Sequence, residues 1–283
     1  EQSGSTTIIL WPGQSRLITD SQIQEYSKKG AILLKKVFDI RWLSLLAEGI
    51  EKNRKDPGPY ACQYTPKDKK GDFYDDYCNW QRIPEYQEFL FNSPAAKIVG
   101  QLTQSRQVRL FHEHILVKEP ETSEKTPWHH DQPYYCVDGE QVCSIWLPLD
   151  PVPREYGLEF ISRSHTWGKM FMPKKFLTHK EYDYKPESFD SIPDIESNRD
   201  QYEILSWDLE PGDCIAFHFK TLHAGAGNPR QSTRRRAFSS RWLGDDTVFA
   251  ERPGKTSPPF PKLTFNHGDS IIHPLFPVCW ENS

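Results

Sequence analysis

Hydrophobic positions in the first hundred residues recur at helical spacing. Residues 39–56 place Leu43, Leu46, Ala47 and Ile50 on one face of a helix, which predicts an amphipathic helix. Residues 53–77, by contrast, are polar and rich in proline and glycine, so we expect a loop there. This part of the chain is therefore predicted to be mainly helical.

Two further signals divide the same region into elements. Asp20 or Ser21 can cap a short helix, and Gly30 can end it in a left-handed conformation. The apolar run at 31–38 predicts a strand, and residues 84–103 predict two helical pieces. Helices thus precede and flank one early strand.

After about residue 107 the pattern changes to short β-branched and aromatic runs separated by turn signals such as "VDGE", "EPGD" and "GNPR". Helices followed by many short strands predict an α+β, mainly β fold, in which the helices pack on one sheet of a sandwich or barrel. We expect one domain with a helical region at about 18–106, a β core at about 107–245 carrying an insertion or lid at 167–204, and an extended tail at 246–283.

Charge and hydropathy argue against a protein that binds nucleic acid or spans a membrane. The formal net charge of −4 gives no basic field for nucleic acid or an anionic membrane, and no apolar run approaches the roughly 18 residues of a membrane span. The N-terminal residues lack a basic segment followed by an apolar stretch, so we expect no secretory signal in them. The six cysteines form no CxxC pair and predict reduced thiols in a cytoplasmic setting. A small molecule is the expected partner, and the oligomeric state stays open.

The stretch "TPWHHDQPYY" holds the first candidate chemistry. On an extended segment His129 and Asp131 point the same way, whereas His130 points to the opposite side. Two histidines and one carboxylate are suitable donors for iron(II) and leave coordination positions open. His223 follows an apolar strand and precedes a glycine-rich turn, so it is our choice for the third ligand.

A second candidate lies about a dozen residues further on, in "RRRAFSSRWLG". In one strand register Arg235, Ala237 and Ser239 share a face, and the two small residues leave room for a bound molecule. A buried arginine can bind one end of a dicarboxylate through two parallel hydrogen bonds. These residues predict an anion site near His223.

Taken in order, "ILVKEPETSEKTPWHHDQPYY", "SIWLPLD", "GLEFISRSH", "PGDCIAFHFKTLHAGAGN" and "RRRAFSSRWLGDD" resemble the phytanoyl-CoA dioxygenase family over roughly residues 18–250. The resemblance implies a double-stranded β-helix and a dioxygenase that uses Fe(II), 2-oxoglutarate and O₂, most simply to hydroxylate a small molecule with release of succinate and CO₂. It implies His129, Asp131 and His223 as the iron ligands, and the retained Asp131 favours hydroxylation, or another outcome of hydrogen abstraction such as desaturation or cyclisation, over halogenation.

The resemblance also implies co-substrate contacts. Counting from His223 favours Arg234 for the far carboxylate of 2-oxoglutarate, whereas alignment on the following strand favours Arg235, which we prefer. Trp146 and Ile115 occupy family positions that line the co-substrate pocket. The chain departs from the family in having His130, Glu155-Tyr156 and Arg163 at loop positions, which bear on substrate choice.

Several aromatic residues are either substrate contacts or framework; they are Tyr134, Tyr135, Phe217 and Trp242. Residues 112–114 ("HEH") with Glu119 partly match a cupin metal motif, but flanking glycines are missing, so we expect His112 and His114 to be strand residues. Two other functions stay open: a catalytically silent binding protein on the same fold, and a zinc hydrolase or lyase using the same three ligands.

Overall fold

The computed structural model describes residues 16–174 and 189–282. It is a mixed α/β structure, mainly β, whose strands pair antiparallel. Part of the expected insertion at 167–204 lies outside the described residues. Among the described helices, none combines the length and the apolar character that crossing a bilayer requires. All six cysteines are described, and each is a free thiol.

The larger sheet has the strand order β1-β10-β7-β12-β4-β3-β2, with β14 also paired to β4. Its strands are β1 (Ala31–Leu34), β2 (Cys62–Gln63), β3 (Phe73–Tyr77), β4 (Gln107–Lys118), β7 (Val142–Pro148), β10 (Cys214–Phe217), β12 (Arg235–Leu243) and β14 (Val278–Glu281). The region expected to be a loop at 53–77 therefore contributes the last two strands at one end of this sheet, β3 and the edge strand β2. β3 pairs with β4 from Phe73 opposite Lys118 to Tyr77 opposite His114.

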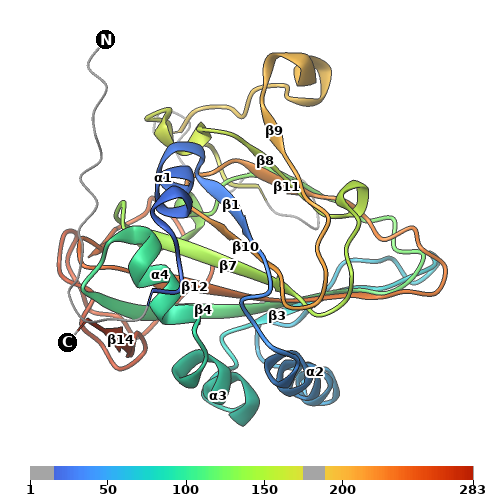
Figure 1. Ribbon diagram of the computed structural model, residues 1–283, viewed down its shortest axis with the longest axis horizontal. Helices are drawn as coiled ribbons and strands as arrows, with labels where there is room; N and C mark the ends of the chain where they lie inside the picture. The colour runs from blue at the N-terminus through green and yellow to red at the C-terminus, as the bar shows by residue number, and fades with distance from the viewer. Residues whose placement is uncertain (1–15, 175–188, 283) are drawn as a thin grey trace.

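The smaller sheet has four strands in the order β5-β11-β8-β9. They are β5 (Thr126–His129), β8 (Leu158–Ile161), β9 (Ile204–Leu205) and β11 (His223–Gly225). Two further strands, β6 (Val137–Asp138) and β13 (Val248–Phe249), form a separate pair. Figure 1 shows the smaller sheet on one side of the larger one and helices on the other.

Four helices cover the outer face of the larger sheet: α1 (Asp20–Lys29), α2 (Ile40–Lys55), α3 (Pro84–Asn92) and α4 (Ala95–Thr103). The predicted apolar face of α2 is confirmed, since Leu43, Leu46 and Ile50 are buried in the core between helices and sheet and Ala47 packs partly buried against it. Gly30 ends α1 at φ 79°, also as predicted, but the cap is Thr19 rather than Asp20 or Ser21. Thr19 forms a capping box with Gln22, so the helix begins one residue before the first of the two predicted caps would allow.

Side chains of the central strands alternate between two environments. On β12, Phe238 and Trp242 join the core under the helices, while Ala237 and Ser239 face the smaller sheet. On β4 the same alternation sends Ile115 and Val117 to the helix side. This register determines which residues can reach the space between the sheets.

Candidate functional site

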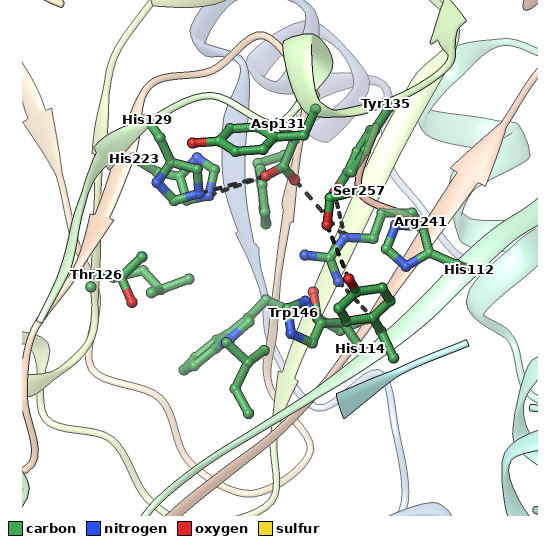
Figure 2. Close-up of a pocket in the computed structure, with 17 residues that line it drawn as sticks. His112, His114, Thr126, His129, Asp131, Tyr135, Trp146, His223, Arg241 and Ser257 are labelled. Carbon is green, nitrogen blue, oxygen red and sulfur yellow. Dashed lines mark hydrogen bonds and ion pairs between the residues drawn. The ribbon is translucent and has the colours of Figure 1, made fainter. Parts of the chain in front are cut away.

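A cavity opens between the two sheets and has an empty volume of about 730 Å³, including space open to solvent. Its lining comes from both sheets, from the segment after β5 and from the C-terminal region. The lining residues are Tyr77, His112, His114, Leu116, Thr126, His129, Asp131, Tyr134, Tyr135, Trp146, Leu158, Phe217, His223, Gly225, Ser239, Arg241 and Ser257. Figure 2 shows His129, Asp131 and His223 together at one side of this space.

Two strand ends and one turn bring these three side chains together. His129 ends β5 and pairs directly with His223, the first residue of β11. Asp131 follows in a turn that is fixed by its backbone N–H donating to Phe219 O at 2.8 Å. Its Oδ1 lies 3.6 Å from His129 Nε2 and 3.8 Å from His223 Nε2. One donor atom from each residue falls within 4.8 Å of the other two, a separation that a single metal ion can bridge.

Both imidazoles are oriented by backbone carbonyls. His129 Nδ1 lies 2.8 Å from Pro127 O, and His223 Nδ1 lies 2.9 Å from Thr221 O. Since a carbonyl only accepts, each Nδ1 carries the hydrogen and each Nε2 carries the lone pair directed at Asp131. Burial lowers the pKa of His129 to about 3 and also lowers the pKa of His223. The rings are therefore neutral at physiological pH, the form that binds metals.

Asp131 is held as a carboxylate although it is buried. Burial by itself would raise its pKa, but His223, Arg241 and His129 together lower it. Its Oδ2 lies 3.3 Å from Ser144 Oγ and 3.9 Å from Arg241 Nε. These contacts leave Oδ1 on the side of the two histidines.

His130 points away from the cavity, as its place between the two candidate ligands predicted. Its Nδ1 lies 3.2 Å from Lys220 O, and its Nε2 accepts from the backbone N–H of Phe171 at 2.9 Å. Both ring nitrogens are thus used to fix neighbouring backbone.

The two candidate arginines face opposite sides of β12. Arg234 forms ion pairs with Glu119 at 2.6 Å and Glu51 at 2.9 Å on the helix side. Arg235 is buried on the side of the smaller sheet and donates to the carbonyls of Tyr156 and Ala226. The described residues give Arg235 no carboxylate partner, and burial lowers its pKa to about 10. It does not itself line the cavity, but it donates to Ala226, the residue that follows the lining residue Gly225.

Lys118 adds a second buried cation next to Arg235. The two residues are paired across β4 and β12, and the side chain of Lys118 donates to Ala226 O, the carbonyl that Arg235 also uses. Burial and the neighbouring Arg235 lower the pKa of Lys118. Two buried basic groups therefore lie side by side at this end of the space between the sheets.

The aromatic and apolar residues predicted to contact co-substrate or substrate fall into two groups, those that line the cavity and those that pack under the helices. Trp146 and Phe217 line the cavity, as do Tyr134 and Tyr135. Ile115 does not: it packs under the helices, and its neighbour Leu116 lines the cavity in its place. The expectation for Ile115 is wrong because successive side chains of a strand point to opposite faces.

Trp242 is also wrongly placed among the substrate contacts. It is fully buried in the core under the helices, and its Nε1 donates to Ser240 Oγ at 2.8 Å. Its strand neighbour Arg241 faces the cavity instead. The tryptophan is framework.

The cupin-like arrangement does not form a metal site among the described residues. Glu119 turns outward to Arg234 and Arg54, whereas His112 and His114 face the cavity. His114 Nε2 lies 2.8 Å from Asp75 Oδ2. The group that could hold a metal in the described part of the chain is His129, Asp131 and His223.

Sequence reasoning missed two polar residues of the cavity wall, Tyr77 and Arg241, and the buried Ser144 that contacts Asp131. Arg241 and Ser144 flank Asp131, and Tyr77 reaches the cavity from a segment expected to be a loop, where its OH lies 3.1 Å from Ser257 Oγ. The signal for Arg241 was present, because it continues the alternation that starts with Arg235. Tyr77 and Ser257 come together only in the folded chain.

Comparisons with known proteins show the family and the fold of this chain. The sequence model of the phytanoyl-CoA dioxygenase family (PhyH) matches residues 26–237. A probable phytanoyl-CoA dioxygenase of Caenorhabditis elegans is 22% identical over 185 residues, which cover 62% of this chain and 54% of that protein. The chain thus spans about half the length of the curated relative that it matches.

Solved structures share the fold at low identity. The non-heme α-ketoglutarate-dependent carbocyclase SnoK from nogalamycin biosynthesis has a TM-score of 0.72 and 18% identity, covering 93% of this chain and 96% of its own. EctD from S. alaskensis, solved with 2-oxoglutarate and 5-hydroxyectoine, has a TM-score of 0.62 and 17% identity, with coverages of 89% and 85%. EvdO2 from Micromonospora carbonacea var. aurantiaca, solved with 2-oxoglutarate, has a TM-score of 0.60 and 18% identity, with coverages of 84% and 95%.

Proposed function

Because the chain belongs to the phytanoyl-CoA dioxygenase family, we propose that it is an Fe(II)- and 2-oxoglutarate-dependent dioxygenase that hydroxylates a small molecule. The observation that carries the proposal is the convergence of His129, Asp131 and His223 in one cavity, with both Nε2 atoms directed at the carboxylate. Succinate and CO₂ are the expected co-products.

The donor set fits iron(II). Two neutral imidazoles and one carboxylate on one side of an ion leave further positions for a chelating keto acid and O₂. Bound iron would supply oxygen activation; the protein supplies the geometry. The carbonyls of Pro127 and Thr221 fix the two rings, and Ser144 and Arg241 hold the outer oxygen of Asp131.

We assign Arg235 to the far carboxylate of 2-oxoglutarate. Its support is burial, the company of Lys118, and the lack of a carboxylate partner among the described residues. A carboxylate next to Gly225 would satisfy a guanidinium that now donates to backbone carbonyls. Arg234 is engaged on the opposite face, so it is not our choice. Trp146 would form an apolar wall beside the bound co-substrate and exclude water from it.

On this proposal the two facing sheets form a double-stranded β-helix, and residues 1–283 form a single oxygenase domain. The lining of the cavity, with Leu116, Leu158 and Phe217 beside the polar residues, suits a small substrate with an apolar part. Among the structural neighbours a carbocyclase and an epimerase occur, so hydroxylation is the outcome that the test must establish.

The test is succinate formation from 2-oxoglutarate under O₂, measured with Fe(II) and ascorbate and again with Zn(II). We expect Fe(II) alone to support turnover and a small-metabolite library to stimulate it. Asp131→Ala should abolish turnover while the circular dichroism spectrum stays native. Asp56→Ala, which removes an exposed ion pair with Arg82, is the matched control and should stay active. Turnover in the Asp131 variant would refute the ligand assignment, and activity with Zn(II) would favour a hydrolase or lyase.

A further inference from the structure

We propose that Arg241 and His112 form the anchor for the substrate, and that this anchor takes a carboxylate carried by a small apolar molecule with a hydroxyl or N–H donor close to it. The inference rests on the proposed function, because it places the anchored molecule beside the candidate iron site. It goes further by naming the chemical class of the substrate and the residues that recognise it.

Arg241 is a buried cation with unused hydrogen-bonding capacity. It lines the cavity, donates through Nε to Tyr135 OH at 2.9 Å and through Nη1 to Ser239 O at 3.0 Å. A guanidinium has five N–H donors, and the described residues accept from two of them here. A planar carboxylate is the acceptor that such a fork fits best.

If a metal ion binds to Asp131, the described residues offer the Arg241 guanidinium no other carboxylate in an ion pair. Its carboxylate contact is Asp131 at 3.9 Å, the residue whose negative charge a metal ion would engage. Glu113 also attracts the guanidinium, but burial raises the pKa of Glu113 to about 8, so much of its charge is lost at neutral pH. The other nearby acid, Asp75, accepts from Tyr64 OH and contacts His114. A substrate carboxylate would supply the missing negative charge.

Two orphaned polar atoms lie on the same wall. His112 is 3% exposed and Ser239 1% exposed, and neither His112 Nε2 nor Ser239 Oγ has a hydrogen-bond partner among the described residues. Both residues line the cavity. Since unsatisfied buried polar groups are costly, these atoms point to a polar ligand group next to Arg241. His112 Nδ1 faces Glu113 O at 3.3 Å, which leaves Nε2 to accept from a donor on the ligand.

The position of Arg241 distinguishes it from the co-substrate anchor. Arg241 and Arg235 are six residues apart on β12, about 20 Å along an extended strand, and both face the smaller sheet. Arg241 contacts the candidate ligand Asp131 directly, which places it next to the metal rather than at the far end of a chelated keto acid. Figure 2 shows Arg241, His112 and His114 grouped across the cavity from His129 and His223.

The rest of the lining defines the body of the ligand. Phe217, Leu116, Leu158 and Trp146 supply apolar surface, and Tyr134 stands beside His129 at a ring-centroid distance of 6.1 Å. An anchored carboxylate with an apolar body would place a C–H bond of that body near the metal. A free sugar or a polyamine would leave this surface and Arg241 unmatched.

The experiment measures binding to protein loaded with Mn(II) and saturating 2-oxoglutarate, so that no turnover occurs. Titration calorimetry compares phenylacetate, 3-phenylpropanoate and cyclohexanecarboxylate with their amides. We expect at least one acid to bind at least about tenfold more tightly than its amide, and Arg241→Gln to remove that preference. Because Arg241 also holds Asp131, each acid is compared with its amide in the same variant, so that any weaker binding of metal or 2-oxoglutarate affects both ligands alike. Arg236→Gln, which changes the outward neighbour paired with Asp150, is the matched control and should keep the preference.

His112→Phe tests the second contact with 3-hydroxy-3-phenylpropanoate against 3-phenylpropanoate. We expect the wild type to prefer the hydroxy acid and the variant to lose that preference. Equal binding of every acid and its amide would overturn the inference, as would an Arg241 variant that keeps the wild-type preference for the acid. If wild-type protein binds neither Mn(II) nor 2-oxoglutarate, the proposed function itself fails, which is a separate result.

Discussion

His223 lies directly opposite His129 in the pairing of β11 with β5, and their ring centroids are 4.2 Å apart. Two residues separated by more than ninety positions in the chain therefore become neighbours through a single strand pairing. Thr221 O and Pro127 O each fix one ring from two residues upstream. The same contact in both strands orients both Nε2 atoms in the metal-free protein. Less side-chain entropy is therefore lost when a metal ion binds.

The first prediction concerns that pair. His223→Ala removes one of two preoriented imidazoles, so we expect affinity for Mn(II) or anaerobic Fe(II) to fall by at least about 100-fold. Titration calorimetry measures it. His267→Ala is the control, because His267 only accepts from Glu251 N on an exposed segment. Equal metal affinity in the two variants would mean that His223 is not a ligand.

The second prediction separates the two arginines. Arg235→Ala should raise the 2-oxoglutarate concentration needed for half-maximal succinate formation by about tenfold or more, since a buried charge pair is lost. Arg234→Ala should leave that concentration nearly unchanged and cost about 0–1 kcal/mol of stability, because its pairs with Glu51 and Glu119 are partly exposed. The opposite ranking would show that the wrong register was chosen.

The features of the fold and of the site that could be predicted from the sequence are those that depend only on residue spacing within one helix or strand. The apolar face of α2 and the shared face of Arg235, Ala237 and Ser239 follow from period alone, and the structure has both. Ile115 was misassigned because a one-residue choice of register moves a side chain to the other face. Which residues of the C-terminal region meet β3 is a matter of tertiary packing, so Ser257 beside Tyr77 had no sequence signal.

Trp242 provides the third prediction, on stability. It is fully buried under the helices, so Trp242→Ala should lower the free energy of unfolding by about 3–5 kcal/mol through the cavity it leaves. Urea denaturation measures this change. Trp128→Ala is the comparison, since Trp128 is only half-buried and its Nε1 donates to Glu196 on the surface. A loss for Trp242→Ala no greater than that of Trp128→Ala would contradict the core assignment.

The fourth prediction concerns Glu113, a fully buried carboxyl on β4. Burial raises its pKa from 4.5 to about 8, and the backbone N–H groups of Asn79 and Trp80 offset only part of that effect. Between these two values the folded chain keeps a proton that the unfolded chain releases. The contribution of Glu113 to stability is therefore fully present below pH 4.5, falls as pH rises towards 8, and changes little beyond that.

Glu113→Gln removes this ionisation while keeping an oxygen for Asn79 N. The stability of the variant relative to wild type should rise with pH between about 4.5 and 8, by an amount on the order of a few kcal/mol, and then level off. Urea denaturation at a series of pH values gives the curve. Glu155→Gln, at an exposed position, should run parallel to wild type throughout. A Glu113 variant whose curve also runs parallel to wild type would mean that the carboxyl is ionised in the folded protein, and Arg241 would then have a permanent counterion on the side away from the cavity.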